Sequence, residues 1–319
     1  MTMTFKDKVL LSFSALRNTN KLDFPQEELT YHTDFIELLA LTSGDEGVSY
    51  GDIQDRFFGE PSESENAEIK DSNELFIREL YSVINERITQ YGEIYPFMID
   101  EKNNLLLKGE LCNIQKLYLF LLVSSSLGIF TPFNSELTTD FETLSYEAIH
   151  NYIPNAVVKS FGKNSEYRGF APEKIRQLAE DIGLETNDNE INKIGKKNVQ
   201  ERGLDVVCWL PFTDNCRNKT VFLCQCACGK NYEYKQHETH RFANYFHFYK
   251  TRPHHSLFIP YSLINPHNGK FYHSDYIEED CLVFERLRIL SLTRKTNDLY
   301  DRLISKDIIE ECIRTILRD

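Results

Sequence analysis

The 319-residue chain lacks an apolar run long enough to cross a membrane, because a spanning helix needs about 20 apolar residues. The longest candidate, residues 117–130, is interrupted by three serines and a glycine, and we expect it to be a buried helix. Residues 1–13 contain neither a long apolar segment nor a small-residue cleavage site, so we expect no secretory signal. These absences favour a cytoplasmic protein that does not bind membranes.

Several common motifs are also absent. The chain has no GxxxxGK(S/T) loop and no GxGxxG segment, which argues against nucleotide hydrolysis and dinucleotide cofactors. It has no Gly-x-Ser-x-Gly elbow of the serine hydrolases. What is present is an ordinary globular composition, with 41% hydrophobic and 27% charged residues. This length and composition predict one large domain or two of ordinary size.

Charge is divided unevenly along the chain. Residues 1–150 carry 11 basic and 26 acidic residues, a net charge of −15, whereas residues 151–319 carry 25 and 23, a net charge of +2. Basic residues that neutralise phosphates supply much of the affinity for nucleic acids, so the acidic charge disfavours DNA binding. A surface that faces DNA remains possible in the second half, and residues 1–130 are a candidate region for recognising a partner or DNA. The acidic half is either a solvated surface or a docking surface for a partner protein.

The chain contains eight cysteines, which we expect to be reduced thiols in a protein without a secretory signal. Cys224, Cys226 and Cys228 alternate along an expected strand, so they would share the side opposite Gln225. Zinc sites usually use Cys-x₂₋₄-Cys turns, so buried thiols packed against a helix are favoured. A zinc-stabilised interaction protein remains an alternative.

Residues 1–130 are predicted to form a mainly helical domain. Ser49, followed three residues later by Asp52, marks the start of one helix. The other expected elements are helices over 34–41 and 74–91, a loop over 59–73, and short strands over 94–99 and 104–107. Three helices and a hairpin resemble the plan of a winged helix, although this order also arises by chance.

Residues 131–319 are predicted to form a second domain, in which strands lie between helices. Pro172 stands in the first turn of one of these helices, where its missing N–H costs little. The expected elements are helices over 138–152 (capped by Thr138), 171–182, 285–294 and 298–317, and strands over 204–212, 220–228, 256–261 and 281–284. The first two strands are joined by a turn cluster and should form a hairpin.

This hairpin carries the sharpest chemical signal. Asp205 interrupts its first strand and Gln225 its second, and such polar side chains are costly inside a sheet unless they are paired or bind a metal. Adjacent antiparallel strands bring the two side chains within reach of one cation, and Mg²⁺ prefers oxygen ligands. The alternatives that need no metal are that Asp205 caps a turn or pairs with Arg202, and that Gln225 satisfies a backbone group at a sheet edge.

The stretch from Glu201 through Asp205, followed by a turn and the strand that ends in Gln225, resembles the hairpin of the PD-(D/E)xK nucleases. With glutamine in place of the second acid, it is similar to the Mrr-type variants of that superfamily. The resemblance covers about residues 138–290. It implies an α/β fold of the restriction-endonuclease type, with a mixed sheet flanked by helices.

The resemblance also implies a metal site. In this superfamily a helix before the hairpin often supplies a further acid, for which Glu142 is the first candidate and Glu147 the second. Asp205, Gln225 and Glu142 would then bind Mg²⁺ or Mn²⁺.

The lysine of the family pattern is displaced in this chain. The pattern has lysine two residues after the acid or glutamine, where this sequence has Ala227. Lys230 has the wrong strand parity relative to Gln225, and Lys235 would lie in the first turn of a following helix. We expect Lys235, or otherwise Lys230, to position the attacking water or to stabilise the phosphate.

The sequence therefore predicts an Mg²⁺-dependent nuclease that hydrolyses phosphodiester bonds, with DNA as the expected substrate. By analogy it would serve in a prokaryotic restriction or antiphage defence system, with a partner protein on the acidic region and a homodimer as a further expectation. The alternative is a catalytically degenerate nuclease fold that binds nucleic acid or protein. The choice between DNA and RNA, and the target sequence, stay open.

Overall fold

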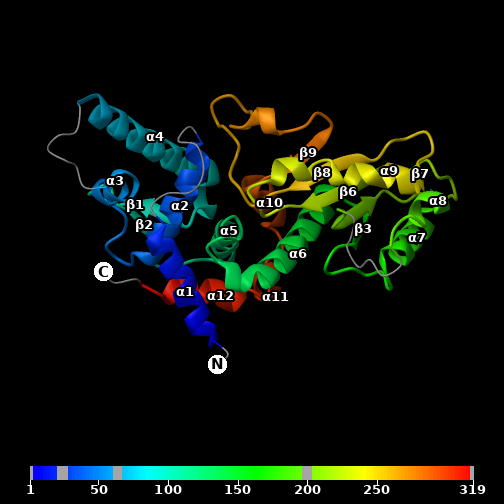
Figure 1. Cartoon of the computed structure of the whole chain (residues 1–319), viewed down its shortest axis with the longest axis horizontal. Helices are drawn as coiled ribbons and strands as arrows, with labels where there is room; N and C mark the ends of the chain where they lie inside the picture. The colour runs from blue at the N-terminus through cyan, green and yellow to red at the C-terminus, as the bar shows by residue number, and fades with distance from the viewer. Residues whose placement is uncertain (1–2, 20–27, 60–66, 196–202, 317–319) are drawn as a thin grey trace. The chain divides into compact units, whose positions relative to one another are not determined.

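The computed structural model describes residues 3–19, 28–59, 67–195 and 203–316 (Figure 1). The chain divides into two compact units, each with its own internal packing. Unit 1 comprises Met1–Asn134, Tyr261–Tyr272 and Tyr300–Asp319, and unit 2 comprises Ser135–Pro260 and His273–Leu299.

This division differs from the expected single boundary at residue 130, because two later segments belong to unit 1. The first segment, Tyr261–Tyr272, is held by a ring contact and a hydrogen bond. The rings of Tyr31 and Tyr261 lie 5.2 Å apart, and the Tyr91 hydroxyl donates to Ser262 Oγ at 2.8 Å. These contacts join residues more than 170 positions apart. Periodicity along the chain does not report such contacts, so the sequence did not reveal them.

The described part of unit 1 is mainly helical. Ser49 and Asp52 form the predicted capping box at the start of one helix. The elements of the unit are α1 (Phe5–Asn18), α2 (Leu29–Thr42), α3 (Tyr50–Phe58), α4 (Ala67–Tyr91), η1 (Gly92–Ile94), β1 (Phe97–Ile99), β2 (Leu105–Leu107), α5 (Asn113–Ser124), η2 (Thr131–Phe133), α11 (Leu299–Arg302, at the border with unit 2) and α12 (Lys306–Arg314). Strands β1 and β2 pair as an antiparallel hairpin.

The loop predicted over residues 59–73 is wrong for its second part, because α4 begins at Ala67; residues 60–66 lie outside the described part. The first turns of α4 are exposed and therefore need no apolar stripe. Alanine, glutamate and lysine have high helix propensity, which explains why this polar stretch is helical.

A buried ionic network joins α2 to α4 in unit 1. Arg87 Nη1 donates to Asp34 Oδ1 and to Glu37 Oε1, each at 2.7 Å, and all three side chains are less than 5% exposed. The hydroxyls of Tyr95 and Tyr118 also donate to Glu37. Buried charges are tolerated only when they are paired and hydrogen-bonded, as these are, so the network is a structural feature of the core.

Unit 2 contains a mixed five-stranded sheet, which confirms the α/β class (Figure 1). The strand order is β3-β5-β6-β8-β9; β3, β5 and β6 are antiparallel neighbours, and β6, β8 and β9 are parallel. The elements are α6 (Asn134–Tyr152), β3 (Val157–Ser160), α7 (Ala171–Ile182), β4 (Glu185–Thr186), α8 (Asp188–Ile191), β5 (Val206–Trp209), β6 (Val221–Cys226), η3 (Tyr232–Lys235), η4 (Glu238–Arg241), α9 (Phe242–Tyr245), β7 (Phe246–His247), β8 (His254–Phe258), η5 (Ser274–Tyr276), β9 (Cys281–Phe284) and α10 (Arg286–Thr293).

Helices pack against both faces of this sheet. Val207 and Leu223, paired across β5 and β6, share a core with apolar residues of α7 and α9. Cys226 has the opposite parity to Leu223, and its thiol forms a hydrogen bond with Ser145 of α6. Helix α6 begins at Asn134 rather than at the predicted cap Thr138. Within the described residues, no helix combines the length and apolar character that a membrane span requires.

Candidate active site

Asp205 and Gln225 meet where β5 begins and β6 ends. The Gln225 amide Nε2 donates to Asp205 Oδ2 at 2.7 Å, and the backbone N–H of Cys226 donates to the same oxygen at 2.7 Å. Asp205 is 9% exposed and Gln225 is 5% exposed. The structure therefore brings together the acid and the amide that the sequence singled out, in a buried position.

Glu142, from α6, joins this pair at the loop that follows β3. The backbone N–H of Lys163 donates to Glu142 Oε2 at 2.8 Å, and the N–H groups of Phe161 and Gly162 donate to the Asp205 carbonyl. A Cβ added at Gly162 would lie 2.7 Å from Glu142 Oε2 and 2.9 Å from Asp205 Oδ1. Two buried carboxylates thus converge on one point beside a glycine.

Glu147, the second candidate for the acid on this helix, lies elsewhere. It follows Glu142 by five residues, which places it about 140° around the helix. Burial raises the pKa of Tyr146, and the charges of Glu166 and Glu147 raise it further. Glu142 is therefore the acid of α6 that meets Asp205.

The two candidate lysines are both exposed, Lys230 in the turn after β6 and Lys235 at the end of η3. Lys235 therefore ends a 3₁₀ helix instead of standing in the first turn of an α-helix as predicted. Burial raises the pKa of the Cys228 thiol; the charge of Lys235 lowers it, and the charges of Asp205 and Glu142 raise it further. The charges of Lys235 and of both acids thus act on the same buried thiol, which favours Lys235 over Lys230.

Two residues of this site had no signal in the sequence: Gly162 and Lys163. The Lys163 ammonium donates to Thr138 Oγ1 at 2.5 Å, and Asn164 Nδ2 donates to the Thr139 carbonyl at 3.0 Å. The loop is thereby held on α6, and the charge of Lys163 also lowers the pKa of Cys228. Gly162 lies two residues after β3, a strand that the sequence analysis did not predict, so nothing drew attention to this loop.

The side chains present suit a hard divalent cation. Carboxylate and amide oxygens are the ligands that Mg²⁺ and Mn²⁺ prefer. Among the described residues, Gln225 Oε1 is buried without a hydrogen-bond partner. Because Gln225 Nε2 donates to Asp205, this oxygen points away from that carboxylate, so Gln225 orients Asp205 and does not share its ion in the predicted way. Over the same residues, no group of three or more His, Cys, Asp or Glu side chains is arranged to hold a metal, so the candidate site rests on two acids and one amide.

The cysteines do not support a zinc site. All eight are free thiols. Burial raises the pKa of both Cys224 and Cys226 well above the usual range, so these thiols stay protonated at neutral pH. Zinc binds thiolates. Cys224 and Cys228 are buried thiols, as the sequence predicted, and the half-buried Cys226 packs against α6.

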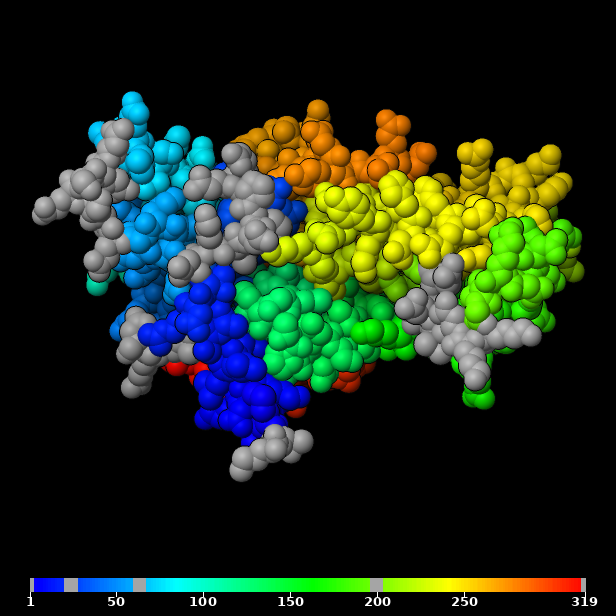
Figure 2. All heavy atoms as spheres, viewed as in Figure 1, coloured from blue at the N-terminus to red at the C-terminus, as the bar shows by residue number. Residues whose placement is uncertain are grey.

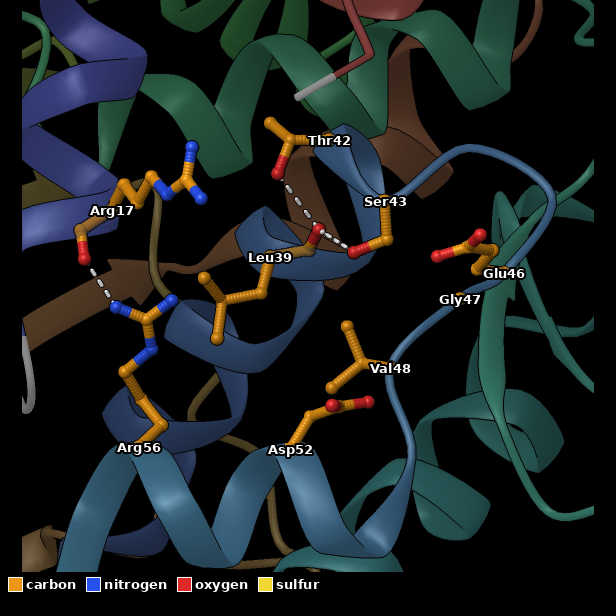
Figure 3. A pocket seen from close by; sticks show the side chains of 9 residues that line it. All are labelled: Arg17, Leu39, Thr42, Ser43, Glu46, Gly47, Val48, Asp52 and Arg56. Carbon is orange, nitrogen blue, oxygen red and sulfur yellow. Dashed lines mark hydrogen bonds between the residues drawn. The ribbon is translucent and has the colours of Figure 1, made fainter. Parts of the chain in front are cut away.

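A separate hollow of about 170 Å³ lies in unit 1 (Figure 3). Arg17 and Arg56 stand on one side of it and Glu46 on another, so the lining carries both signs of charge. Arg56 donates to the Arg17 carbonyl, and Asp52 accepts from the backbone N–H of Ser49. Because its lining carries both signs of charge, this hollow indicates no ligand of a particular charge.

The chain that follows β6, coloured yellow, lies at the surface on the face that Figure 2 shows. This stretch carries the exposed Lys230 and Lys235.

No family model, curated protein or solved structure matches the chain. Its function is therefore inferred from the geometry of the site and from the residues themselves.

Proposed function

We propose that the protein is a nuclease that hydrolyses phosphodiester bonds in DNA with the help of Mg²⁺ or Mn²⁺. The observation that carries this proposal is the convergence of Glu142 Oε2 and Asp205 Oδ1 beside Gly162. Two buried carboxylates repel each other unless a cation or a proton lies between them. The order of an acid-bearing helix, an Asp strand and a Gln strand follows the pattern of the PD-(D/E)xK superfamily, which supports a phosphodiester substrate.

Each side chain has a role that follows from its contacts. Asp205 and Glu142 would hold the cation, and Gln225 fixes the orientation of the Asp205 carboxylate through its hydrogen bond. The backbone N–H of Lys163 fixes Glu142 in the same way. When bound, a divalent cation supplies Lewis-acid stabilisation of charge on the phosphate and a more acidic water.

Lys235 is assigned the role of binding phosphate. Its side chain is exposed, so a substrate can reach it from solvent. Its charge lowers the pKa of the Cys228 thiol, which the charges of Asp205 and Glu142 raise. An ammonium group near the scissile phosphate neutralises negative charge and orients the phosphate or the water.

One observation favours a second candidate, a nuclease fold that binds DNA without cutting it. Ala227, which stands where the family pattern has lysine, is 1% exposed and has no ionisable group. Such a protein would still bind DNA. It would show no cleavage with Mg²⁺ or Mn²⁺.

Asp205→Asn provides the test of the proposed activity. The amide keeps the shape of the carboxyl group but removes its charge, so we expect nicking of supercoiled plasmid DNA with Mg²⁺ to fall at least ~100-fold while the protein stays folded. In the same assay Lys235→Met should lose activity and Lys230→Met should retain it.

Asp275→Asn, at an exposed acid of η5, is the matched control and should cleave like the wild type. Full activity of Asp205→Asn would contradict the proposal. DNA binding by a wild-type protein that never cleaves would favour the second candidate.

A further inference from the structure

The amide of Gln225 is held in one orientation. Its Nε2 donates to Asp205 Oδ2 at 2.7 Å and to the Cys226 carbonyl at 3.3 Å. Turning the amide over would place its oxygen against these two acceptors, which is unfavourable. The carbonyl oxygen Oε1 therefore points away from Asp205. Among the residues that the structure describes, this buried oxygen has no hydrogen-bond partner.

Gln225 Oε1 faces Gly203 and Glu238. A Cβ added at Gly203 would lie 3.2 Å from Gln225 Oε1 and less than 3.0 Å from both Glu238 Cβ and Glu238 Oε2. Glu238, the first residue of η4, approaches this closely because Gly203 has no side chain. Gly203 also has a φ of 81°, which favours glycine at this position.

Two acceptor oxygens thus face the same small space. An ionised glutamate and an amide carbonyl cannot donate a hydrogen bond to each other, so their proximity is unfavourable without a cation between them. Mg²⁺ and Mn²⁺ are suited to this position, because Mg²⁺ typically uses one or two carboxylates and completes its shell with waters or substrate phosphates. Both protein ligands are hard oxygens, which disfavours zinc and copper.

We propose that Gln225 Oε1 and Glu238 form a second binding position for a hydrated divalent cation. This position is distinct from the one beside Gly162, since the two oxygens of Asp205 separate them: Oδ1 faces Gly162, and Oδ2 accepts from Gln225 Nε2. Its role, neutralising a further part of a phosphodiester substrate, rests on the proposed function. The binding of the cation does not, so it can be measured without cleavage.

The test is a titration of the full-length protein with Mn²⁺ alone, followed by electron paramagnetic resonance of the free ion. We expect two Mn²⁺ per wild-type chain and one per Glu238→Gln chain, with the remaining affinity changed less than about threefold. Glu142→Gln should lose the other ion. Glu233→Gln, a change at a neighbouring acid in η3, is the matched control and should retain both ions.

Each result bears on the inference differently. One Mn²⁺ per wild-type chain would overturn the second position and leave the proposed function standing. Two Mn²⁺ in Glu238→Gln would overturn the role of Glu238. No Mn²⁺ in the wild type would overturn the second position and the proposed function together.

Circular dichroism of each variant at the titration temperature verifies that the variant is folded. Glu238→Ala replaces Glu238→Gln if Glu238→Gln does not fold.

Discussion

Gly162 follows β3 almost directly and has no side chain that would keep Glu142 and Asp205 apart. Its φ lies outside the left-handed region, so the backbone there would accept other residues. A Cβ atom at this position would lie less than 3.0 Å from two carboxylate oxygens, so any other residue would force them to move. The missing side chain is thus a component of the candidate cation site.

Gly162→Ala should therefore weaken cation binding. The new methyl group would stand 2.7 Å from Glu142 Oε2 and 2.9 Å from Asp205 Oδ1, so one carboxylate has to move. We expect Mn²⁺ affinity to fall at least ~10-fold and the free energy of unfolding to fall by about 1–3 kcal/mol, as is typical of overpacked sites. Isothermal titration calorimetry and urea unfolding measure the two effects.

Gly229→Ala is the matched control, because a Cβ at Gly229 meets no atom within 4 Å and its φ is not positive. It should bind Mn²⁺ like the wild type. Unchanged Mn²⁺ affinity in Gly162→Ala would show that the two carboxylates do not hold an ion at this point.

At the scale of elements, η4 is fixed to β8 by histidine contacts. Thr239 Oγ1 lies 2.8 Å from His255 Nδ1, and the rings of His240 and His255 stack with centroids 3.7 Å apart. Burial, together with the charges of His240 and His254, lowers the pKa of His255 to about 4, against the opposing charge of Asp280. His255 is thus neutral in the folded protein at neutral pH. Its neutral ring contacts Thr239 and His240 of η4, the helix that also carries Glu238.

Acidification should destabilise this arrangement in a defined pH range. Histidine in an unfolded chain has a pKa of about 6.5, so between pH 6.5 and about 4 the unfolded state binds more protons than the folded state. The free energy of unfolding should fall as the pH is lowered through this range, and His255 should contribute no further loss below it. Urea unfolding at pH 7 and pH 5 measures the difference.

His255→Phe keeps an aromatic ring on His240 but cannot be protonated. It should reduce the loss of stability between pH 7 and pH 5, and at pH 7 it should be about 1 kcal/mol less stable because Thr239 loses its partner. His247→Phe, at an exposed histidine of β7, should keep the wild-type pH dependence. Equal pH dependence in the wild type and in His255→Phe would contradict this account.

At the scale of the whole molecule, the chain forms two units with separate cores, and every residue of the candidate site lies in unit 2. A ligand that binds only the folded state stabilises that state by RT ln(1 + [L]/Kd), or about 2.7 kcal/mol at a concentration of 100 Kd. Separate domains often unfold in separate transitions. A cation bound in unit 2 should therefore stabilise only that unit.

We therefore expect differential scanning calorimetry to show two transitions, of which Mg²⁺ raises the temperature of only one. EDTA should reverse the shift, and Asp205→Asn should abolish it because the site loses a charged ligand. NaCl at equal ionic strength is the control for screening. A shift of the same size in Asp205→Asn would mean that Mg²⁺ stabilises the protein at another place.

The sequence alone determined the local features of this protein. The capping box at Ser49 follows from the spacing of Ser49 and Asp52. The meeting of Asp205 with Gln225 follows from the hairpin of β5 and β6, because the turn sets which residues of adjacent antiparallel strands lie opposite each other. Glu142 was identified through the resemblance, which supplied the order of elements that periodicity cannot.

The tertiary structure was needed to identify which distant residues complete the site and which segments belong to each unit. Glu142, Gly162 and Asp205 come from three separate segments of the chain, and Gly203 contacts Glu238, 35 positions further along. Hydrophobic periodicity reports which face of a helix or strand is buried, but not which loop passes over it. The approach of a carboxylate to a glycine depends on loop conformation and on packing between elements, so this part of the site is a property of the folded chain.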